Sequence, residues 1–340
     1  ILVFNSPVMQ LCMYGTILLI SWLGAHQIVA SNMTTGELMS LFTYTTSILM
    51  SLMMMSMVFV MVTMSIASGR RIAEVLNQES DLTSPENGIQ TVENGTIDFE
   101  DVSFHYGNDE NILSHISLHI PSGSTLGILG ATGSSKSSLV QLIPRLYDVT
   151  QGSVKVAGID VRDYDLKVLR DNVAMVLQKN TLFSGTIKEN LMWGNENATD
   201  AEIEAAASSA CVDEFIDRLP GRYDMHLEQG GVNVSGGQKQ RLCIARAILK
   251  QPKVLILDDS TSAVDTATDA KIRKAFAEDL KDTTKIIIAQ RVNSVSTADK
   301  IIVMDDGKIS AIGTHDELME SSEIYKDVYK SQQEGVGLRE

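Results

Sequence analysis

The pattern of hydrophobic and polar positions divides the chain into two unequal parts. Residues 1–69 carry a single charged side chain, Glu37, whereas charges are spread through the remainder. Two uncharged runs, residues 7–28 and about 40–67, are long enough to cross a bilayer, which takes about 20 apolar residues. The polar link between them lacks lysine and arginine, and two arginines, beginning at Arg70, follow the second run. The pattern predicts two transmembrane helices with the arginine side in the cytoplasm.

The second of these runs is dense in methionine, a residue whose thioether adapts to irregular apolar shapes. These side chains could line a path for apolar ligands, or they could fill a helix interface or face lipid. The two runs could also form a buried hairpin of a soluble protein, but two consecutive uncharged stretches of this length favour membrane helices. Because the chain starts at Ile1 within an apolar run, we expect a fragment whose preceding portion is missing.

Residues 68–84 are expected to leave the membrane as a helix and then become a polar linker. After this linker region, residues 70–94, the chain has the pattern of an α/β domain, residues 95–340. Short, wholly apolar runs such as residues 254–257 are typical of parallel strands covered on both faces. The other expected strand features are a change of register near Glu100 and Asp101, hairpins at Ala157-Gly158 and Asp306-Gly307, and a second buried strand at residues 286–289.

The middle of this domain, about residues 180–250, is helical in character. Thr199 and Glu202 form the capping-box pattern ahead of an alanine-rich helix, and a helix from Ser235 is expected to stop before Pro252. We therefore expect a helical subdomain within the α/β domain.

Composition narrows the choice of partners. The formal net charge of −15 argues against nucleic acid, because phosphate backbones are bound by basic faces. Three widely separated cysteines, Cys12, Cys211 and Cys243, fit no metal-binding spacing, so they predict reduced thiols in a cytosolic or membrane setting.

The strongest candidate for chemistry is the segment GATGSSKS. It follows an apolar run at residues 126–129 and precedes residues 138–147, whose apolar positions recur at helical spacing. This order of strand, glycine-rich loop and helix is that of a phosphate-binding loop, in which N–H groups and a helix N-terminus meet phosphate oxygens. The residues expected to bind nucleotide here are Gly130, Ala131, Thr132, Gly133, Ser134, Ser135, Lys136, Ser137 and Ser138.

Particular roles follow from this pattern. Lys136 would reach the β- and γ-phosphates, and the Ser137 hydroxyl would bind Mg²⁺. The usual pattern has glycine where this chain has Ser135, and a positive φ there would cost about 1 kcal/mol. The apolar strand KVLILD delivers Asp258 at its carboxyl end, where open α/β sheets bind ligands, so Asp258 is the candidate Mg²⁺ partner of Ser137.

Two adjacent glycines in a first helical turn are a further signal. The segment NVSGGQKQR places Gly236 and Gly237 directly after Ser235, and Gln238 completes a capping box with that serine. Glycine is unfavourable in a helix unless something approaches the backbone closely. A phosphate group would account for the pair.

In this set and order of motifs the chain resembles the C-terminal half of an ABC-type exporter subunit, over essentially all of its 340 residues. The resemblance implies the last two transmembrane helices of that subunit, fused to an α/β P-loop NTPase domain that binds ATP and Mg²⁺ and couples hydrolysis to transport. It also implies a dimer whose two domains sandwich two ATP molecules. The expected setting is the plasma membrane, with the domain in the cytoplasm and a drug, lipid or peptide as the exported substrate.

The resemblance also assigns roles to matching residues. Tyr106, ahead of the phosphate loop, would stack on adenine, and Gln178 in MVLQKNTLFSGTI would link Mg²⁺ to the membrane domain. The stretch from Ser235 to Gln238 matches the family's SGGQ signature, which binds the γ-phosphate of ATP held by the other subunit. Residues 262–265, beginning with Ser262, match the loop that crosses the dimer interface.

The chain departs from the family pattern at three further positions. The glutamate that orients and deprotonates the attacking water is here Asp259, whose carboxylate falls short by roughly 1.5 Å. Loss of a well-placed base costs roughly 10² to 10⁴ in rate. The switch histidine is Gln290, which can donate a hydrogen bond to the γ-phosphate but cannot carry a charge. Ahead of the signature, Gln229 stands at the usual glutamate position, with Glu228 displaced by one.

Altered hydrolytic positions beside an intact signature favour the degenerate half of a heterodimeric exporter. In such a pair the chain's own site holds ATP and hydrolyses it slowly, while its signature completes the competent site of a second half-transporter. A homodimer with two slow sites, and a non-transporting ATP-gated channel or regulatory subunit, are the alternatives. The two membrane runs and the acidic charge disfavour a lone soluble ABC ATPase.

Overall fold

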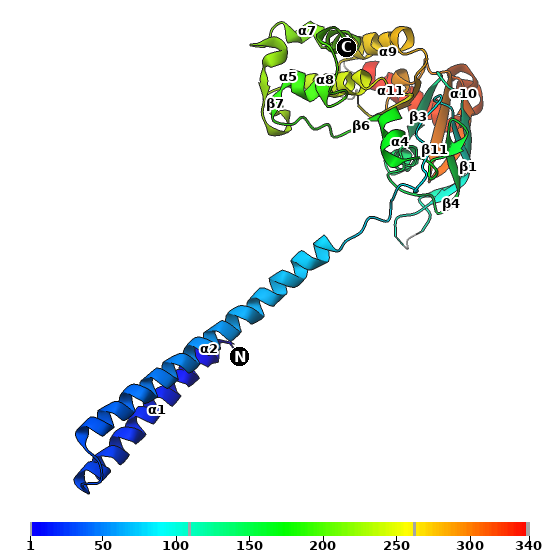
Figure 1. Ribbon diagram of the computed structural model, residues 1–340. Helices are drawn as coiled ribbons and strands as arrows, with labels where there is room; N and C mark the ends of the chain where they lie inside the picture. The colour runs from blue at the N-terminus through cyan, green and yellow to red at the C-terminus, as the bar shows by residue number, and fades with distance from the viewer. Residues whose placement is uncertain (1, 108–109, 261–262, 338–340) are drawn as a thin grey trace. The chain divides into compact units, whose positions relative to one another are not determined.

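The computed structural model describes residues 2–107, 110–260 and 263–337 of the chain. Ser262, at the start of the expected interface loop, lies outside the described residues. The chain forms two compact units, residues 1–81 and residues 82–340 (Figure 1).

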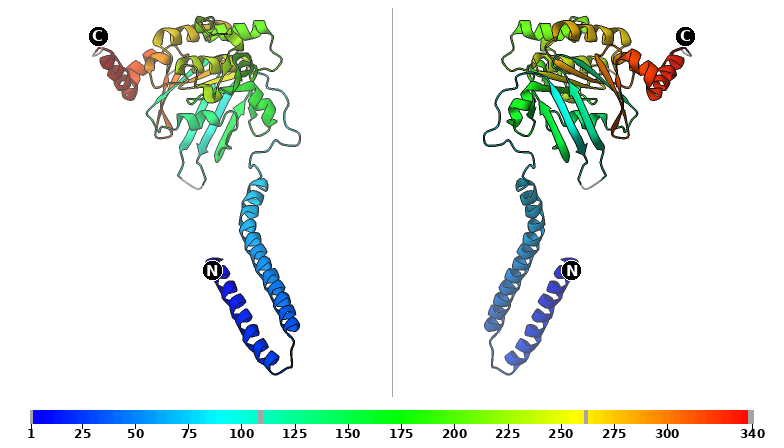
Figure 2. Two further views of the ribbon diagram at one scale, coloured as in Figure 1. Left: turned by 90° about the vertical axis from the view of Figure 1, so that its left-hand side faces the viewer. Right: turned by 90° about the vertical axis from the view of Figure 1, so that its right-hand side faces the viewer.

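The first unit is a pair of antiparallel helices, α1 (Leu2–Val29) and α2 (Thr35–Leu76) (Figure 2). A capping box at Thr34 starts the second helix. The segment Pro7–Val29 and the whole of α2 are long and apolar enough to cross a membrane, and α2 contains no buried residue. Because α2 continues past the second predicted span, the first part of residues 70–94 is helical.

The second unit is built on a six-stranded sheet in the order β12-β11-β3-β10-β9-β6. β12 pairs antiparallel with β11, and the other neighbours are parallel. Every residue of β9 and β10 is buried, which confirms the prediction of two strands covered on both faces. The strands of this sheet are β3 (Thr125–Gly130), β6 (Val173–Val176), β9 (Val254–Asp258), β10 (Thr284–Ile288), β11 (Lys300–Asp305) and β12 (Lys308–Gly313).

A smaller antiparallel sheet has the order β2-β1-β4-β5. β1 changes register against both neighbours around Glu100 and Asp101, as predicted. The predicted hairpins are also confirmed, because residues 157–158 and 306–307 turn with positive φ between paired antiparallel strands. The strands of this sheet are β1 (Ile97–Phe104), β2 (Leu113–Ile120), β4 (Gln151–Val156) and β5 (Ile159–Asp160).

The segment between β6 and β9 is largely helical and lies on the side of the domain away from β1 and β4 (Figure 1). Thr199 and Glu202 make the predicted capping box, and the helix that follows Ser235 ends before Pro252, also as predicted. This segment comprises β7 (Gly185–Thr186), α5 (Ile187–Met192), α6 (Asp200–Ser209), α7 (Asp213–Ile216), η1 (Arg222–Asp224), β8 (His226–Leu227), η2 (Gln229–Gly231) and α8 (Gly236–Leu249).

The remaining helices pack around the sheets. They are α3 (Lys136–Gln141), α4 (Leu166–Asn172), α9 (Thr266–Asp279), η3 (Val292–Ser294), α10 (His315–Ser321) and α11 (Glu323–Gly337).

The prediction of a helix over residues 138–147 is wrong in its length, because α3 ends at Gln141. Pro144 has no N–H to donate, so the helical ladder cannot continue through it. Arg145 then turns the chain with a φ of +50°, and its guanidinium makes two hydrogen bonds to the Asp148 carboxylate (2.7 and 3.0 Å). Leu142 and Ile143 are buried in tight turns instead, whereas Leu146 is exposed.

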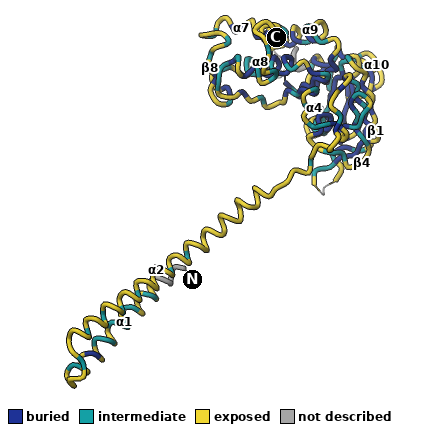
Figure 3. Tube along the Cα trace, viewed as in Figure 1, coloured by how far each residue is buried: buried dark blue, intermediate teal, exposed yellow. Residues whose placement is uncertain are grey.

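The six-stranded sheet separates two apolar cores, seen as the dark interior in Figure 3. Alternate side chains of a strand point to opposite faces. Leu255 and Leu257 accordingly join the core shared with the helical segment, whereas Val254 and Ile256 join the core between the two sheets. All three cysteines are free, as predicted.

Candidate nucleotide-binding site

Four neighbouring parallel strands, β3, β10, β9 and β6, bring the candidate residues to one edge of the large sheet. The last residues of β9 and β10, Asp258 and Ile288, are in register. Because the carboxyl ends of parallel strands share an edge, segments that follow them emerge side by side. The residues that emerge at this edge are the loop 130–138, Gln178, Asp258, Asp259 and Gln290.

The loop after β3 encloses the Lys136 side chain. Its Nζ donates to the carbonyl oxygens of Gly130 (2.9 Å) and Ala131 (2.7 Å) and to Ser134 Oγ (3.1 Å). Partial burial lowers the pKa of the Lys136 ammonium, and the two carboxylates at the end of β9 act in the opposite direction. The ammonium is thus bonded to neutral oxygens, and a phosphate group would offer it a charged acceptor instead.

The same loop presents backbone donors. The N–H groups of Lys136 and Ser137 donate to no oxygen of the described residues, as is common in a first helical turn. The backbone ahead of them turns with positive φ at Gly133 (+90°) and Ser135 (+67°). Ser135 therefore occupies the left-handed conformation that the usual glycine adopts without cost. Unpaired N–H groups beside a cationic side chain fit a phosphate group.

Tyr106 lies beside this loop, just after β1. Its hydroxyl is 3.1 Å from Ser138 Oγ and 3.4 Å from Gln141 Oε1, both on α3. Its ring meets Phe104 and Tyr147 edge to face, with centroids 4.8 and 4.9 Å apart. The half-buried ring is thereby held next to the phosphate loop. Tyr147 was not singled out from the sequence, since no motif includes it.

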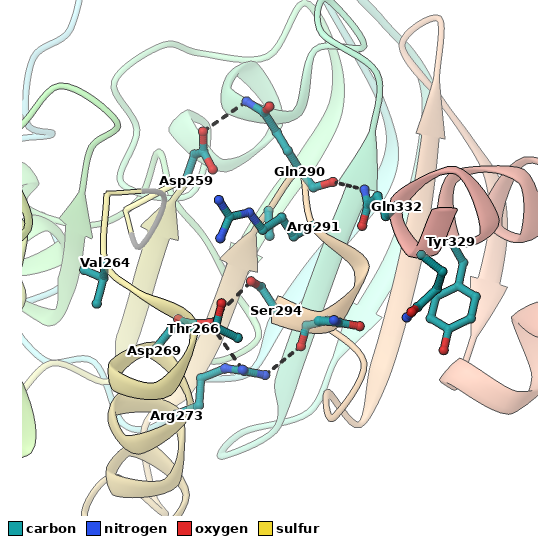
Figure 4. A pocket seen from close by; sticks show the side chains of 13 residues that line it. Asp259, Val264, Thr266, Asp269, Arg273, Gln290, Arg291, Ser294, Tyr329 and Gln332 are labelled. Atoms are coloured by element: carbon teal, nitrogen blue, oxygen red, sulfur yellow. Dashed lines mark hydrogen bonds and ion pairs between the residues drawn. The ribbon is translucent and has the colours of Figure 1, made fainter. Parts of the chain in front are cut away.

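The Asp259 carboxylate is the meeting point of the two candidate glutamines. Gln178 Nε2 donates to Asp259 Oδ2 at 3.2 Å, and Gln290 Nε2 donates to the same oxygen at 3.0 Å, as Figure 4 shows for Gln290. The glutamines come from the segments after β6 and β10, the strands on either side of β9. The three residues expected from the sequence to act in catalysis are therefore in direct contact.

The backbone conformation of Asp259 and the pKa of its carboxyl are both unusual. Its φ is +48°, and its N–H donates to the carbonyl oxygen of the last residue of β10 (3.0 Å). Burial raises the pKa of the Asp259 carboxyl above its ordinary range; the hydrogen bond from Gln178 opposes this effect, and the charge of Asp258 adds to it. A carboxylate with a raised pKa is a stronger base than an exposed aspartate.

A magnesium site can be assembled at the same edge. Among the described residues there is no group of three or more His, Cys, Asp or Glu side chains placed to hold a metal. Mg²⁺ needs no such group, because it is commonly bound by one or two carboxylates together with phosphate oxygens and water. The buried Asp258, with the Ser137 hydroxyl and the Gln178 amide, fits that donor set.

The signature glycines of α8 differ in their surroundings. Ser235 caps the helix, its hydroxyl accepting from the Gln238 N–H while Gln238 Oε1 accepts from the Ser235 N–H. A Cβ added to Gly237 would lie 2.9 Å from the Ala263 carbonyl oxygen, too close for an ordinary contact. A Cβ added to Gly236 would find, among the described residues, only the Ala263 Cβ at 3.7 Å. Contacts with the described residues thus account for glycine at 237 but not at 236.

The sheet order, the phosphate loop after β3 and the acid at the end of β9 define a P-loop nucleoside triphosphatase domain. Residues 113–262 match the family model described as ABC transporter. This domain is therefore of the ABC type, and it follows an N-terminal helical segment.

Curated relatives share both parts of the chain. The uncharacterized ABC transporter ATP-binding protein YfiB of Bacillus subtilis is 43% identical, over 97% of this chain and 57% of the relative. The putative multidrug export ATP-binding/permease protein YgaD of the same organism is 44% identical, over 79% of this chain and 47% of the relative. The ATP-dependent lipid A-core flippase of Desulfotalea psychrophila is 36% identical, over 97% of this chain and 58% of the relative.

A solved structure, of a bacterial Atm1-family ABC exporter with ATP bound, superimposes with a TM-score of 0.80 at 29% identity, covering 97% of this chain and 58% of that one. The chain has the fold of the matching part of that exporter: a helical segment followed by an ABC-type nucleotide-binding domain. It spans about half the length of the curated relatives it matches.

Proposed function

We propose that the chain is the ATP-binding part, with the adjoining membrane helices, of an exporter subunit whose own ATP site is slow and whose signature completes the site of a different partner subunit. The setting is a cell membrane, with the nucleotide-binding domain in the cytoplasm. The names of the multidrug exporter and lipid flippase relatives support an apolar or amphipathic substrate. Two long, apolar helices support a membrane-embedded path for it.

The observation that carries this proposal is the state of the Asp259 carboxylate. A general base must come within about 2.6–3.2 Å of the proton it abstracts. The side chain here is one methylene shorter than the family's glutamate, and one of its oxygens accepts hydrogen bonds from both Gln178 and Gln290. Both features hinder contact with an attacking water, so a rate lowered by roughly 10² to 10⁴ is expected.

The signature motif on α8 supports the presence of a partner subunit. The described residues leave room for a side chain at Gly236, so its lack of one favours close approach by something outside the chain. The ATP of a facing subunit would make such an approach. In this arrangement the chain contributes Ser235 to Gln238 to a competent site and keeps the phosphate loop, Asp258 and Asp259 for its own ATP.

A homodimer with two slow sites is the second candidate. The raised pKa of Asp259 favours it, because a stronger base partly offsets a less favourable position. The third candidate is a non-transporting ATP-gated channel or regulatory subunit, a function that requires the site to bind ATP but not to hydrolyse it efficiently.

The test is the steady-state ATPase activity of the full-length subunit, alone and co-expressed with a neighbouring half-transporter. The double variant Asp259→Glu with Gln290→His restores the family residues and serves as the comparison. Negligible activity alone, activity with the partner, and its loss when the partner's own glutamate is replaced would support the proposal. Turnover by the subunit alone that Asp259→Ala abolishes would instead establish Asp259 as a working base. Stimulation of the ATPase by a drug or lipid would separate a transporter from a channel or regulator.

A further inference from the structure

The C-terminal helix α11 is held against the domain by one face. The Tyr325 side chain is fully buried, and its hydroxyl lies 2.7 Å from His315 Nδ1 on α10. The His315 ring also meets Tyr329 at a centroid distance of 5.5 Å. Tyr325, Tyr329 and Gln332 are four and three residues apart, the spacing that places side chains on one face of a helix. The buried anchor therefore sets where Gln332 points.

Gln332 bonds the backbone on both sides of Arg291, directly after β10. Its Nε2 donates to the Gln290 carbonyl oxygen at 2.7 Å, and its Oε1 accepts from the Val292 N–H at 2.9 Å. The first bond is drawn in Figure 4. The Gln332 side-chain amide thus pairs with this short segment as the backbone of a neighbouring β-strand would, with its nitrogen donating and its oxygen accepting.

The same segment carries the side chain that reaches Asp259. Before Gln290, the Ala289 N–H donates to the Ile128 carbonyl oxygen on β3, which holds that end in the sheet. After it, Gln332 holds the peptide groups on both sides of Arg291. With the backbone held on both sides, the direction of the Gln290 side chain is restricted, and its Nε2 meets Asp259 Oδ2 at 3.0 Å.

A second helix, α9, makes hydrogen bonds to the turn that follows this segment, at Asn293 and Ser294. On α9, Arg273 Nη1 donates to the Asn293 carbonyl oxygen (2.8 Å), and Asp269 pairs with Arg273 (3.2 Å) and accepts from the Ser294 hydroxyl (3.4 Å). A cavity of about 410 Å³ lies among α9, this segment and α11, as Figure 4 shows. Open space adjoins the segment at this cavity, but Val292 is fully buried and the Arg291 carbonyl oxygen accepts from the Ser294 N–H (3.1 Å), so the Gln332 bonds add to these restraints.

We propose that Gln332 is a positioning residue for the Gln290 switch: α11 sets the backbone from which the Gln290 amide reaches Asp259 and the position of the γ-phosphate. This inference rests on the switch role proposed for Gln290. Displacing α11 would then alter the ATP site without any contact between α11 and nucleotide.

The test uses the full-length subunit in complex with its partner. Hydrogen exchange of peptides covering residues 290–296 reports the Val292 N–H bond directly. Photolabelling of this chain by 8-azido-ATP, competed with β,γ-imido-ATP or with ADP, reports how strongly its site prefers a γ-phosphate. Gln332→Ala should speed exchange in the segment and lower that preference by roughly 2- to 10-fold, the loss of one hydrogen bond. Ser331→Ala, an exposed neighbour on α11, should change neither.

A double-mutant cycle separates positioning from mere packing. If Gln332 acts through Gln290, then Gln332→Ala should have no further effect on the γ-phosphate preference when Gln290→Ala is already present. Faster exchange with unchanged preference, or additive effects of the two variants, would overturn the inference. Should Gln332→Ala not fold, Gln332→Glu keeps the acceptor for Val292 and loses the donor to Gln290, so normal exchange with lowered preference is expected. None of these outcomes depends on whether Asp259 is a working base, which the ATPase comparison decides.

Discussion

Gln290 Nε2 and Asp259 Oδ2 lie 3.0 Å apart, joining the second residue after β10 to the first residue after β9. In the family pattern these positions hold a histidine and a glutamate, and here both are changed to residues that still form a hydrogen bond. The Gln290 amide can donate a hydrogen bond to the Asp259 carboxylate, but it carries no charge and cannot relay a proton. On the roles proposed for these two residues, the pair would have less acid–base chemistry than a histidine and a glutamate.

The conformation of Ser135 leads to a stability prediction. A non-glycine residue in the left-handed region costs about 1 kcal/mol, so Ser135→Gly should stabilise the nucleotide-free domain by up to that amount, less the added flexibility of the unfolded glycine. Ser208→Gly, at an exposed position in α6, is the matched control and should destabilise by about 1 kcal/mol or less. Thermal unfolding of both variants would show the opposite signs. A destabilising Ser135→Gly would mean that the serine side chain is needed in the loop.

The two signature glycines should respond differently to alanine. Gly237→Ala pushes a Cβ against the Ala263 carbonyl oxygen, so it should destabilise the subunit by roughly 1–3 kcal/mol. Among the described residues Gly236→Ala meets only an ordinary contact, and in a helix it should be neutral or stabilising by up to about 1 kcal/mol. The measurement is thermal unfolding of each variant without nucleotide. Gly236→Ala should nonetheless lower the ATPase activity of the complex; a variant with full activity would argue against the approach of a partner's nucleotide.

The raised pKa of Asp259 predicts a dependence of stability on pH. The folded protein holds this proton more tightly than the unfolded chain does, so ionisation of Asp259 disfavours folding. The penalty is fully present above the folded-state pKa and disappears as the pH falls below 3.8, the ordinary value. Asp259→Asn should therefore raise the unfolding temperature near pH 7, and the gain should shrink as the pH is lowered.

Asp282→Asn, which removes an exposed carboxylate just before β10, controls for the change in net charge. Unfolding followed from about pH 7 down to about pH 4 makes the comparison. A gain from Asp259→Asn that stays constant with pH would mean that burial does not disfavour the carboxylate.

Much of the architecture was predictable because it depends on local patterns. Uncharged runs of bilayer length, wholly apolar strands and turn pairs such as Asp306-Gly307 each restrict the backbone by themselves. The helix after the phosphate loop was predicted too long, since its apolar spacing satisfies a helix and a set of buried turns equally well. Only the packing around Pro144 and the Arg145–Asp148 pair distinguishes the two.

The sequence by itself indicated the class of chemistry, binding of a nucleoside triphosphate. A phosphate loop, an acid at the end of a strand and a capped pair of glycines are short motifs that can be recognised from residue types and spacing alone. The tertiary structure alone decided how the distant parts meet. The order of four parallel strands brings Gln178 and Gln290 onto one oxygen of Asp259. The docking of α11 places Gln332 against the Gln290 carbonyl oxygen, 42 residues away along the chain. Such contacts depend on strand order and helix packing, which no local pattern encodes.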